Sequence, residues 1–250
     1  MKHMAISGGG DAREIPSRAD ELEELPPKHG TLRAWIYSRI RRSIILGEYP
    51  AGMRLNEVRL AEELQVSRVP LRESFHRLER DGFISLEPRR SAVVTSWNAA
   101  RVNDLFDVRL GLEVEASGVV ARRVGRGEMP VPELHDLVDR ERAALDRGDL
   151  LAVAEISTEF HTRIVELTGN ALMVSLMAQI AQRMTWLFYL TSARDPEKAC
   201  AEHDELIDDI ATGNEALVRS IAHAHIEKGR LPTLRVMRLI TTDPLSARKR

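Results

Sequence analysis

The sequence predicts a mainly α-helical protein in two structured parts: a short three-helix unit with a two-stranded hairpin, and a longer all-helical bundle. Three observations predict this class. Apolar residues recur at three- and four-residue intervals along most of the chain, aromatic residues make up only 4% of it, and β-branched runs are few. With 43% hydrophobic residues, the 250-residue chain can form one large core or two ordinary ones.

Composition excludes several classes of protein. The longest apolar stretch, residues 171–190, is interrupted by Gln179, Gln182 and Arg183, which predicts a buried helix rather than a membrane span. The N-terminus carries no apolar signal segment. A lone Cys200 excludes an internal disulfide and fits a reducing compartment. We therefore expect a cytoplasmic protein with no membrane partner.

Charge is distributed unevenly along the chain. Residues 31–96 contain 12 Arg and no Lys against 8 acidic residues, a net charge of +4 on a chain whose total is −2. A basic segment on a near-neutral chain favours an anionic partner. Scattered, solvated arginines explain the same excess about as well, so charge alone leaves the partner open.

Residues 1–29 are rich in Gly, Pro and acidic residues, which predicts a disordered segment. The first domain is expected over residues 30–96. Apolar residues at 32, 36, 40 and 44 predict a helix from Thr31 to Leu46. "GEYPAGMRL" follows as a turn, and a second helix over 56–64 begins with Asn56 as its N-cap.

A third helix is predicted to start at Ser67, whose hydroxyl is expected to accept from the free amides of the first turn. Pro70 falls at the third helical position, where a missing N–H is harmless. After this helix, "FISLE" and "AVVTS" flank a basic tip at Arg89 and Arg90 and predict a hairpin. Three helices followed by such a hairpin predict a winged helix-turn-helix.

The outward face of the third helix carries Arg68 and Arg72, four residues apart. A helix of this kind fits the major groove of DNA, with its N-terminal residues at base edges or phosphates. Ser67 can donate to a phosphate, and the wing arginines can hold the flanking backbone. Arg77, four residues after Glu73, is expected to form an intrahelical ion pair instead.

The second domain is expected over residues 97–240, with a basic tail at 241–250. Gly–Asp and Gly–Asn pairs at 148, 169 and 213 separate apolar-striped segments, each pair combining a helix end with the N-cap of the next helix. Six helices are predicted, over 98–123, 131–147, 149–168, 170–193, 196–212 and 214–239. Six such helices imply a bundle.

Three histidines of this bundle raise the question of metal binding. His161, His203 and His225 lie on different predicted helices beside apolar neighbours, so they can meet in the core. Imidazole suits Zn, Ni, Cu or Fe. A single buried histidine is more often a structural residue, so the residues alone favour a metal only weakly. His223, two residues before His225, is expected to face elsewhere.

The stretch "GEYPAGMRLNEVRLAEELQVSRVPLRESFHRLERDGFI" resembles the N-terminal domain of GntR-family transcriptional regulators, whose pattern runs PG..L.E..LA..L.VSR.P.RE...RLE..G. The resemblance implies that Arg68 and Arg72 contact DNA, while Ser67 and Pro70 set the helix start. The wing departs from the family, because Ser91 stands where a Gly commonly follows the basic pair.

The segments "DLFDVRLGLE", "FHTRIVELTGN", "AEHDELIDDI" and "AHAHI" resemble the FCD ligand-binding domain of the FadR-type branch. Many members of that branch bind a metal through an Asp-x-x-x-His pair and two later histidines. The resemblance implies His161, His203 and His225 as ligands of a divalent ion such as Zn or Ni. Ser157 stands at the Asp position, which removes a charge and a strong oxygen donor and leaves metal binding open.

Arg109 and Glu113 match the R-x-x-L-E pattern of the same branch. The resemblance implies that Arg109 faces the pocket, where a guanidinium can hold the carboxylate of a small organic acid bidentately. Ser157 would then leave room for that effector at the ion. The alternative is an ion pair between Arg109 and Glu113, which contributes little if it is exposed.

Together these features predict a metabolite-responsive DNA-binding transcriptional regulator, not an enzyme. We expect a repressor that binds a palindromic operator as a homodimer and responds to a small carboxylate effector. One alternative is a metal-dependent hydrolase-like enzyme that uses the three histidines, but no separate nucleophile or base motif accompanies them. Another is an architectural DNA-binding protein, which leaves the large helical domain unexplained.

Overall fold

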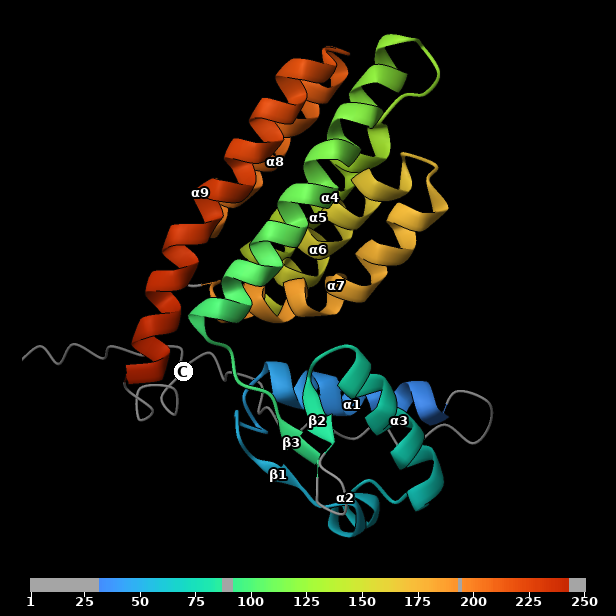
Figure 1. The fold of residues 1–250 in the computed structure, drawn as a ribbon, viewed down its shortest axis with the longest axis vertical. Helices are drawn as coiled ribbons and strands as arrows, with labels where there is room; N and C mark the ends of the chain where they lie inside the picture. Colours follow the sequence, from blue (N-terminus) through green and yellow to red (C-terminus); the bar gives the residue numbers. More distant parts are fainter. Residues whose placement is uncertain (1–31, 87–91, 193–194, 243–250) are drawn as a thin grey trace, which may run out of the picture.

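The computed structural model describes residues 32–86, 92–192 and 195–242 and shows a mainly α-helical chain (Figure 1). A winged helix-turn-helix unit lies at one end of a six-helix bundle, as predicted. The segment expected to be disordered, residues 1–29, lies outside the described residues. So do the wing-tip residues Arg89, Arg90 and Ser91, and the tail beyond residue 242.

The first unit contains three helices and three short strands: α1 Leu32–Ile45, β1 Arg54–Leu55, α2 Glu57–Glu63, α3 Arg68–Arg80, β2 Ile84–Leu86 and β3 Ala92–Val94. Its core is apolar, and Ile36, Leu71 and Phe75 are almost fully buried. The prediction that "GEYPAGMRL" is only a turn is wrong, since this segment contains β1. This strand pairs antiparallel with β3 and makes a three-stranded sheet of order β1-β3-β2. A two-residue strand is too short to show an alternating pattern in the sequence.

Two other local predictions for α3 are wrong. Ser67 occupies the N-cap position, but its hydroxyl makes no capping bond, because this exposed helix end has access to water. Arg77 does not pair with Glu73. Its guanidinium lies 3.9 Å from the centre of the Tyr37 ring and its Nε lies 3.8 Å from Asp81, so it meets an aromatic face as well as a carboxylate.

The bundle consists of α4 Ala99–Gly125, α5 Pro132–Asp146, α6 Leu150–Glu166, α7 Ala171–Leu190, α8 Pro196–Ala211 and α9 Glu215–Thr242. All six predicted helices are confirmed. Asn98, Asp149, Asn170 and Asn214 each accept a bond from a first-turn amide of the helix that follows. α4 packs along α9, and α6 lies between α5 and α7. Among the described helices, none combines the length and apolarity that crossing a bilayer requires.

The bundle contacts the first unit through α6 and α7, and α7 lies next to α1 in Figure 1. Trp186 of α7 is only 5% exposed because it packs into the core of the first unit. From α6, Glu155 accepts a hydrogen bond from Arg41 of α1 at 2.8 Å. Arg183 of α7 donates to the carbonyl of Arg80 at the end of α3. The C-terminal end of α3 is therefore connected directly to the bundle.

Candidate DNA interface and metal centre

The N-terminal end of α3 presents polar side chains to solvent. Ser67, Arg68, Arg72 and His76 are all exposed, and Pro70 is half-buried at the third position of the helix. Leu71, Phe75 and Leu78 occupy the opposite, buried face. This is the division of faces that a helix needs to enter a major groove, since its apolar side anchors it while its outer side meets the bases.

Arg72 has a partner within the protein. Its Nε donates to Oε2 of Glu57 at 2.7 Å, although the Arg72 side chain remains 54% exposed. Arg68 and Arg72 therefore lie on one accessible surface, as the sequence predicts.

The second site lies in the bundle core, where three histidines from three helices converge. His161 of α6 and His203 of α8 are buried, and His225 of α9 is half-buried. One ring nitrogen from each lies within 4.8 Å of the other two. Imidazole nitrogens on a common tetrahedral ion, at about 2.0–2.1 Å from it, lie roughly 3.3 Å apart. These three nitrogens are therefore close enough together to be candidate ligands of one divalent ion.

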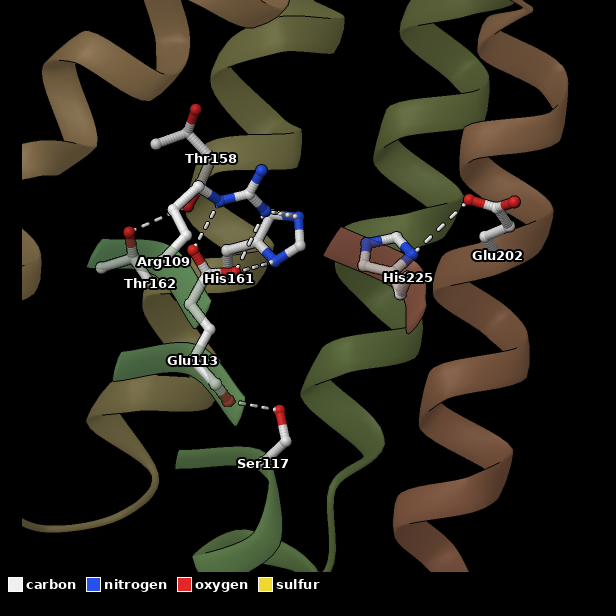
Figure 2. Close-up of polar contacts among 8 residues, drawn as sticks. All are labelled: Arg109, Glu113, Ser117, Thr158, His161, Thr162, Glu202 and His225. Atoms are coloured by element: carbon white, nitrogen blue, oxygen red, sulfur yellow. Dashed lines mark hydrogen bonds and ion pairs between the residues drawn. The ribbon is translucent and has the colours of Figure 1, made fainter. Parts of the chain in front are cut away.

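Each histidine has a glutamate beside its Nδ1. His161 Nδ1 lies 3.0 Å from Glu113, and His203 Nδ1 lies 2.8 Å from Glu141. His225 Nδ1 lies 3.6 Å from Glu202, just beyond hydrogen-bonding distance (Figure 2). A carboxylate on Nδ1 fixes the ring and leaves Nε2 as the donor atom, which is the usual arrangement around a metal-binding histidine.

Arg109 lies against the same group. It donates to both carboxylate oxygens of Glu113, at 2.6 and 3.1 Å, and its Nη2 lies 3.4 Å from Nε2 of His161 (Figure 2). All three side chains are buried. The ion pair with Glu113 is therefore present, and it is buried rather than exposed. Effector binding by Arg109 stays a prediction.

Burial and charge set the protonation of this group. Burial alone raises the pKa of Glu113, but the neighbouring Arg109 and His161 outweigh it and hold the pKa well below its usual range. Burial lowers the pKa of His161 to about 3, against the opposing effect of Glu113. It also lowers the pKa of His225. Neutral imidazoles have a free lone pair, so these rings are in the form that binds metal.

The cavity at the histidines is small. It measures about 10 Å³ and is bordered by Glu113, Ser117, His161 and His225, with apolar residues completing its wall. That volume is close to what one water molecule or ion needs and is far below the size of an organic acid. His203, Arg109 and Ser157 are not among its lining residues. Ser157 is half-buried on α6.

Thr158, the residue next to Ser157, makes a buried polar contact to another helix. Thr158 is buried and accepts a hydrogen bond from Thr185 of α7 at 3.0 Å. The sequence did not predict this pair, nor the roles of Glu141 and Glu202. Glu141 had a signal, because it interrupts the apolar stripe of Leu134, Val138 and Leu145. A charge at a core position commonly has a specific partner. Glu202 had none.

Comparison with known proteins identifies both parts of the chain. The family of bacterial regulatory proteins called gntR matches residues 32–94, and the FCD domain matches residues 104–228. The chain belongs to the GntR family, with an FCD domain. As a member of this family it is a DNA-binding transcriptional regulator and not an enzyme. The comparisons give no support to the hydrolase alternative.

Relatives of this GntR regulator cover most of its length. It is 28% identical to the Nta operon transcriptional regulator of Aminobacter aminovorans, over 77% of this chain and 90% of that one. It is 25% identical to the HTH-type transcriptional regulator YdhC of Bacillus subtilis, over 76% and 85% respectively.

Solved structures share its fold. A GntR-type transcriptional regulator from Rhodococcus sp. RHA1 superimposes with a TM-score of 0.69 at 20% identity, over 82% of this chain and 99% of that one. McbR/YncC of E. coli superimposes with a TM-score of 0.67 at 18% identity, over 85% of this chain and 100% of that one.

Proposed function

We propose that this GntR regulator is a repressor that binds a palindromic operator as a homodimer. Arg68 and Arg72 would contact base edges, Ser67 a phosphate, and Arg89 and Arg90 the flanking backbone. The observation that carries this proposal is the exposed pair of arginines at the N-terminal end of α3, opposite a buried apolar face. A single winged helix makes a small interface, so operator affinity favours two copies on two half-sites. A repressor of this kind acts in the cytoplasm, where the DNA is.

The experiment is selection of bound duplexes from a random library. The proposal predicts an enriched sequence with two-fold symmetry and half-sites one or more helical turns apart. Enrichment of a single unsymmetrical half-site, or of no sequence, would contradict it.

In the same proposal, His161, His203 and His225 hold a divalent ion such as Zn or Ni through Nε2. The support is the convergence of the three donors and the glutamates beside their Nδ1 atoms. An ion with three neutral ligands keeps an open position, and it supplies a positive charge that binds a carboxylate. Arg109 is a second cationic group for the same small organic acid. A cavity of about 10 Å³ must widen to admit this acid.

Helix α6 connects the proposed effector site to DNA. It carries His161 at the ion site, Thr158 bonded to α7, and Glu155 bonded to Arg41 of the DNA-binding unit. An effector that widens the cavity would move α6 and α7 relative to α1. The spacing of the two recognition helices in the dimer would change, and the effector would favour the arrangement with lower operator affinity.

A further inference from the structure

Glu57 is an acidic residue on the surface that carries Arg68 and Arg72. It is the first residue of α2, and Asn56 fixes this helix start by accepting bonds from the amides of Val58 and Arg59. From there its carboxylate reaches across the helix-turn-helix to Nε of Arg72 at 2.7 Å. The Glu57 side chain is 30% exposed, so the pair is at the surface and contributes little to stability.

A carboxylate beside a DNA-binding arginine weakens DNA binding. It repels phosphates and cancels part of the charge that attracts them, so it lowers affinity for any DNA. Its benefit is geometric. The bond from Arg72 to Glu57 uses Nε, on the side of the guanidinium. No described residue bonds the two terminal nitrogens of Arg72, and two such neighbouring donors can bond O6 and N7 of guanine together.

We propose that Glu57 is a positioning residue that holds Arg72 in the orientation for reading guanine and keeps it from serving as a mobile phosphate contact. Glu57 thereby lowers affinity for random DNA and raises discrimination for the operator. This inference rests on the proposed function, in which Arg72 contacts a base edge. It assigns base selectivity to a residue of α2, outside the recognition helix.

The test compares Glu57→Gln with Glu73→Gln in the full-length protein. Glu73 is a suitable control because it is on α3, is 49% exposed and pairs with Arg33 rather than with Arg72. Dissociation constants are measured for the operator, for operators substituted base by base, and for random duplex across a salt series. Both variants lose one negative charge, so both should bind random DNA several-fold more tightly. Only Glu57→Gln should lower the ratio of operator to random affinity, by about tenfold, with the loss at one guanine.

Two further variants, Arg72→Ala and its combination with Glu57→Gln, show whether Glu57 acts through Arg72. Arg72→Ala should lose discrimination at the same guanine, and adding Glu57→Gln to it should cause no further loss. An unchanged ratio in Glu57→Gln, or the same ratio change in Glu73→Gln, would overturn the inference while leaving the proposed function intact. An equal additional loss in the Arg72→Ala background would overturn it too. If Arg72→Ala itself does not change discrimination at any base, Arg72 does not contact a base, and the proposed function on which the inference rests is wrong. Melting curves check that every variant is folded.

Discussion

Trp186 of α7 stacks on Phe83 of the DNA-binding unit, with ring centroids 5.2 Å apart. Trp97, in the connection before α4, meets the same indole edge-on at 5.8 Å. The residue before Trp186 is Thr185, which bonds Thr158 on the helix that carries His161. Only a few packed side chains therefore separate the proposed ion site from the unit that binds DNA.

Trp186→Ala should weaken the attachment of the two parts. Loss of a buried tryptophan at such an interface costs about 3–5 kcal/mol of unfolding free energy, by the cavity that it leaves. We expect a lower melting temperature and a weaker effect of ligands on operator affinity. Trp186→Phe retains an aromatic ring against Phe83, so it should keep much of the thermal stability and of the ligand effect on operator affinity. Equal stability of the wild type and the alanine variant in thermal melts would contradict the contact.

Metal binding should stabilise the protein and depend on His203. An ion at a hundredfold excess over its Kd raises the free energy of unfolding by about 2.7 kcal/mol, so a chelator should lower the melting temperature of the wild type. His203→Ala should abolish the metal and the chelator effect. Ser157→Asp should tighten binding, because it adds an anionic oxygen four residues before His161, on the same side of α6.

Elemental analysis and melts with and without chelator check this prediction on the three proteins. If the wild type carries no metal, shows no chelator effect, and neither substitution changes that, the histidines are structural or contact an organic ligand directly.

Glu141→Gln should weaken metal binding without removing a ligand. The amide still bonds His203 but no longer offers a charged acceptor, and changes of this kind commonly reduce metal affinity about 10–100-fold. Glu202→Gln is the matched comparison and should have the smaller effect, because its carboxylate lies 3.6 Å from His225 rather than 2.8 Å. Titration with a competing chelator measures both. Equal affinities in Glu141→Gln and wild type would show that Glu141 has no part in holding the ring.

Dimer formation should be visible in solution. We expect light scattering to give twice the mass of the 28.2 kDa chain at micromolar concentration. A single half-site should bind far more weakly than the full operator, because it engages only one recognition helix. A monomer that binds an isolated half-site at full strength would contradict the prediction.

The sequence predicted the helices because apolar periodicity, and a capping side chain at several helix starts, are local signals. Asn98, Asp149 and Asn170 accept first-turn bonds in the structure, and such signals depend only on neighbouring residues. Placing the three histidines on separate helices favoured their meeting only weakly, and the resemblance to the FCD branch was what implied it. Contacts set by tertiary packing were not predictable. Periodicity places Glu141 or Trp186 on a buried face but does not say which helix it meets.

Arg109 illustrates the same limit at the candidate site. The sequence leaves two alternatives for this residue, an ion pair or a place in the pocket, whereas its guanidinium, with several donors, bonds Glu113 and also lies beside His161. The size of the cavity was equally beyond the sequence, because about 10 Å³ is what remains after many side chains have packed.

The most direct test of DNA reading by α3 is the operator affinity of the Arg68→Ala/Arg72→Ala double variant, measured with random duplex in parallel at fixed salt. Arg147→Ala is the control, since this arginine is exposed at the end of α5 in the bundle. Removing one arginine–base pairing should cost about 1–3 kcal/mol of operator binding. We predict that the double variant binds operator little better than random duplex, whereas Arg147→Ala keeps full discrimination. Unchanged operator affinity in a folded double variant would contradict DNA reading by the N-terminal end of α3.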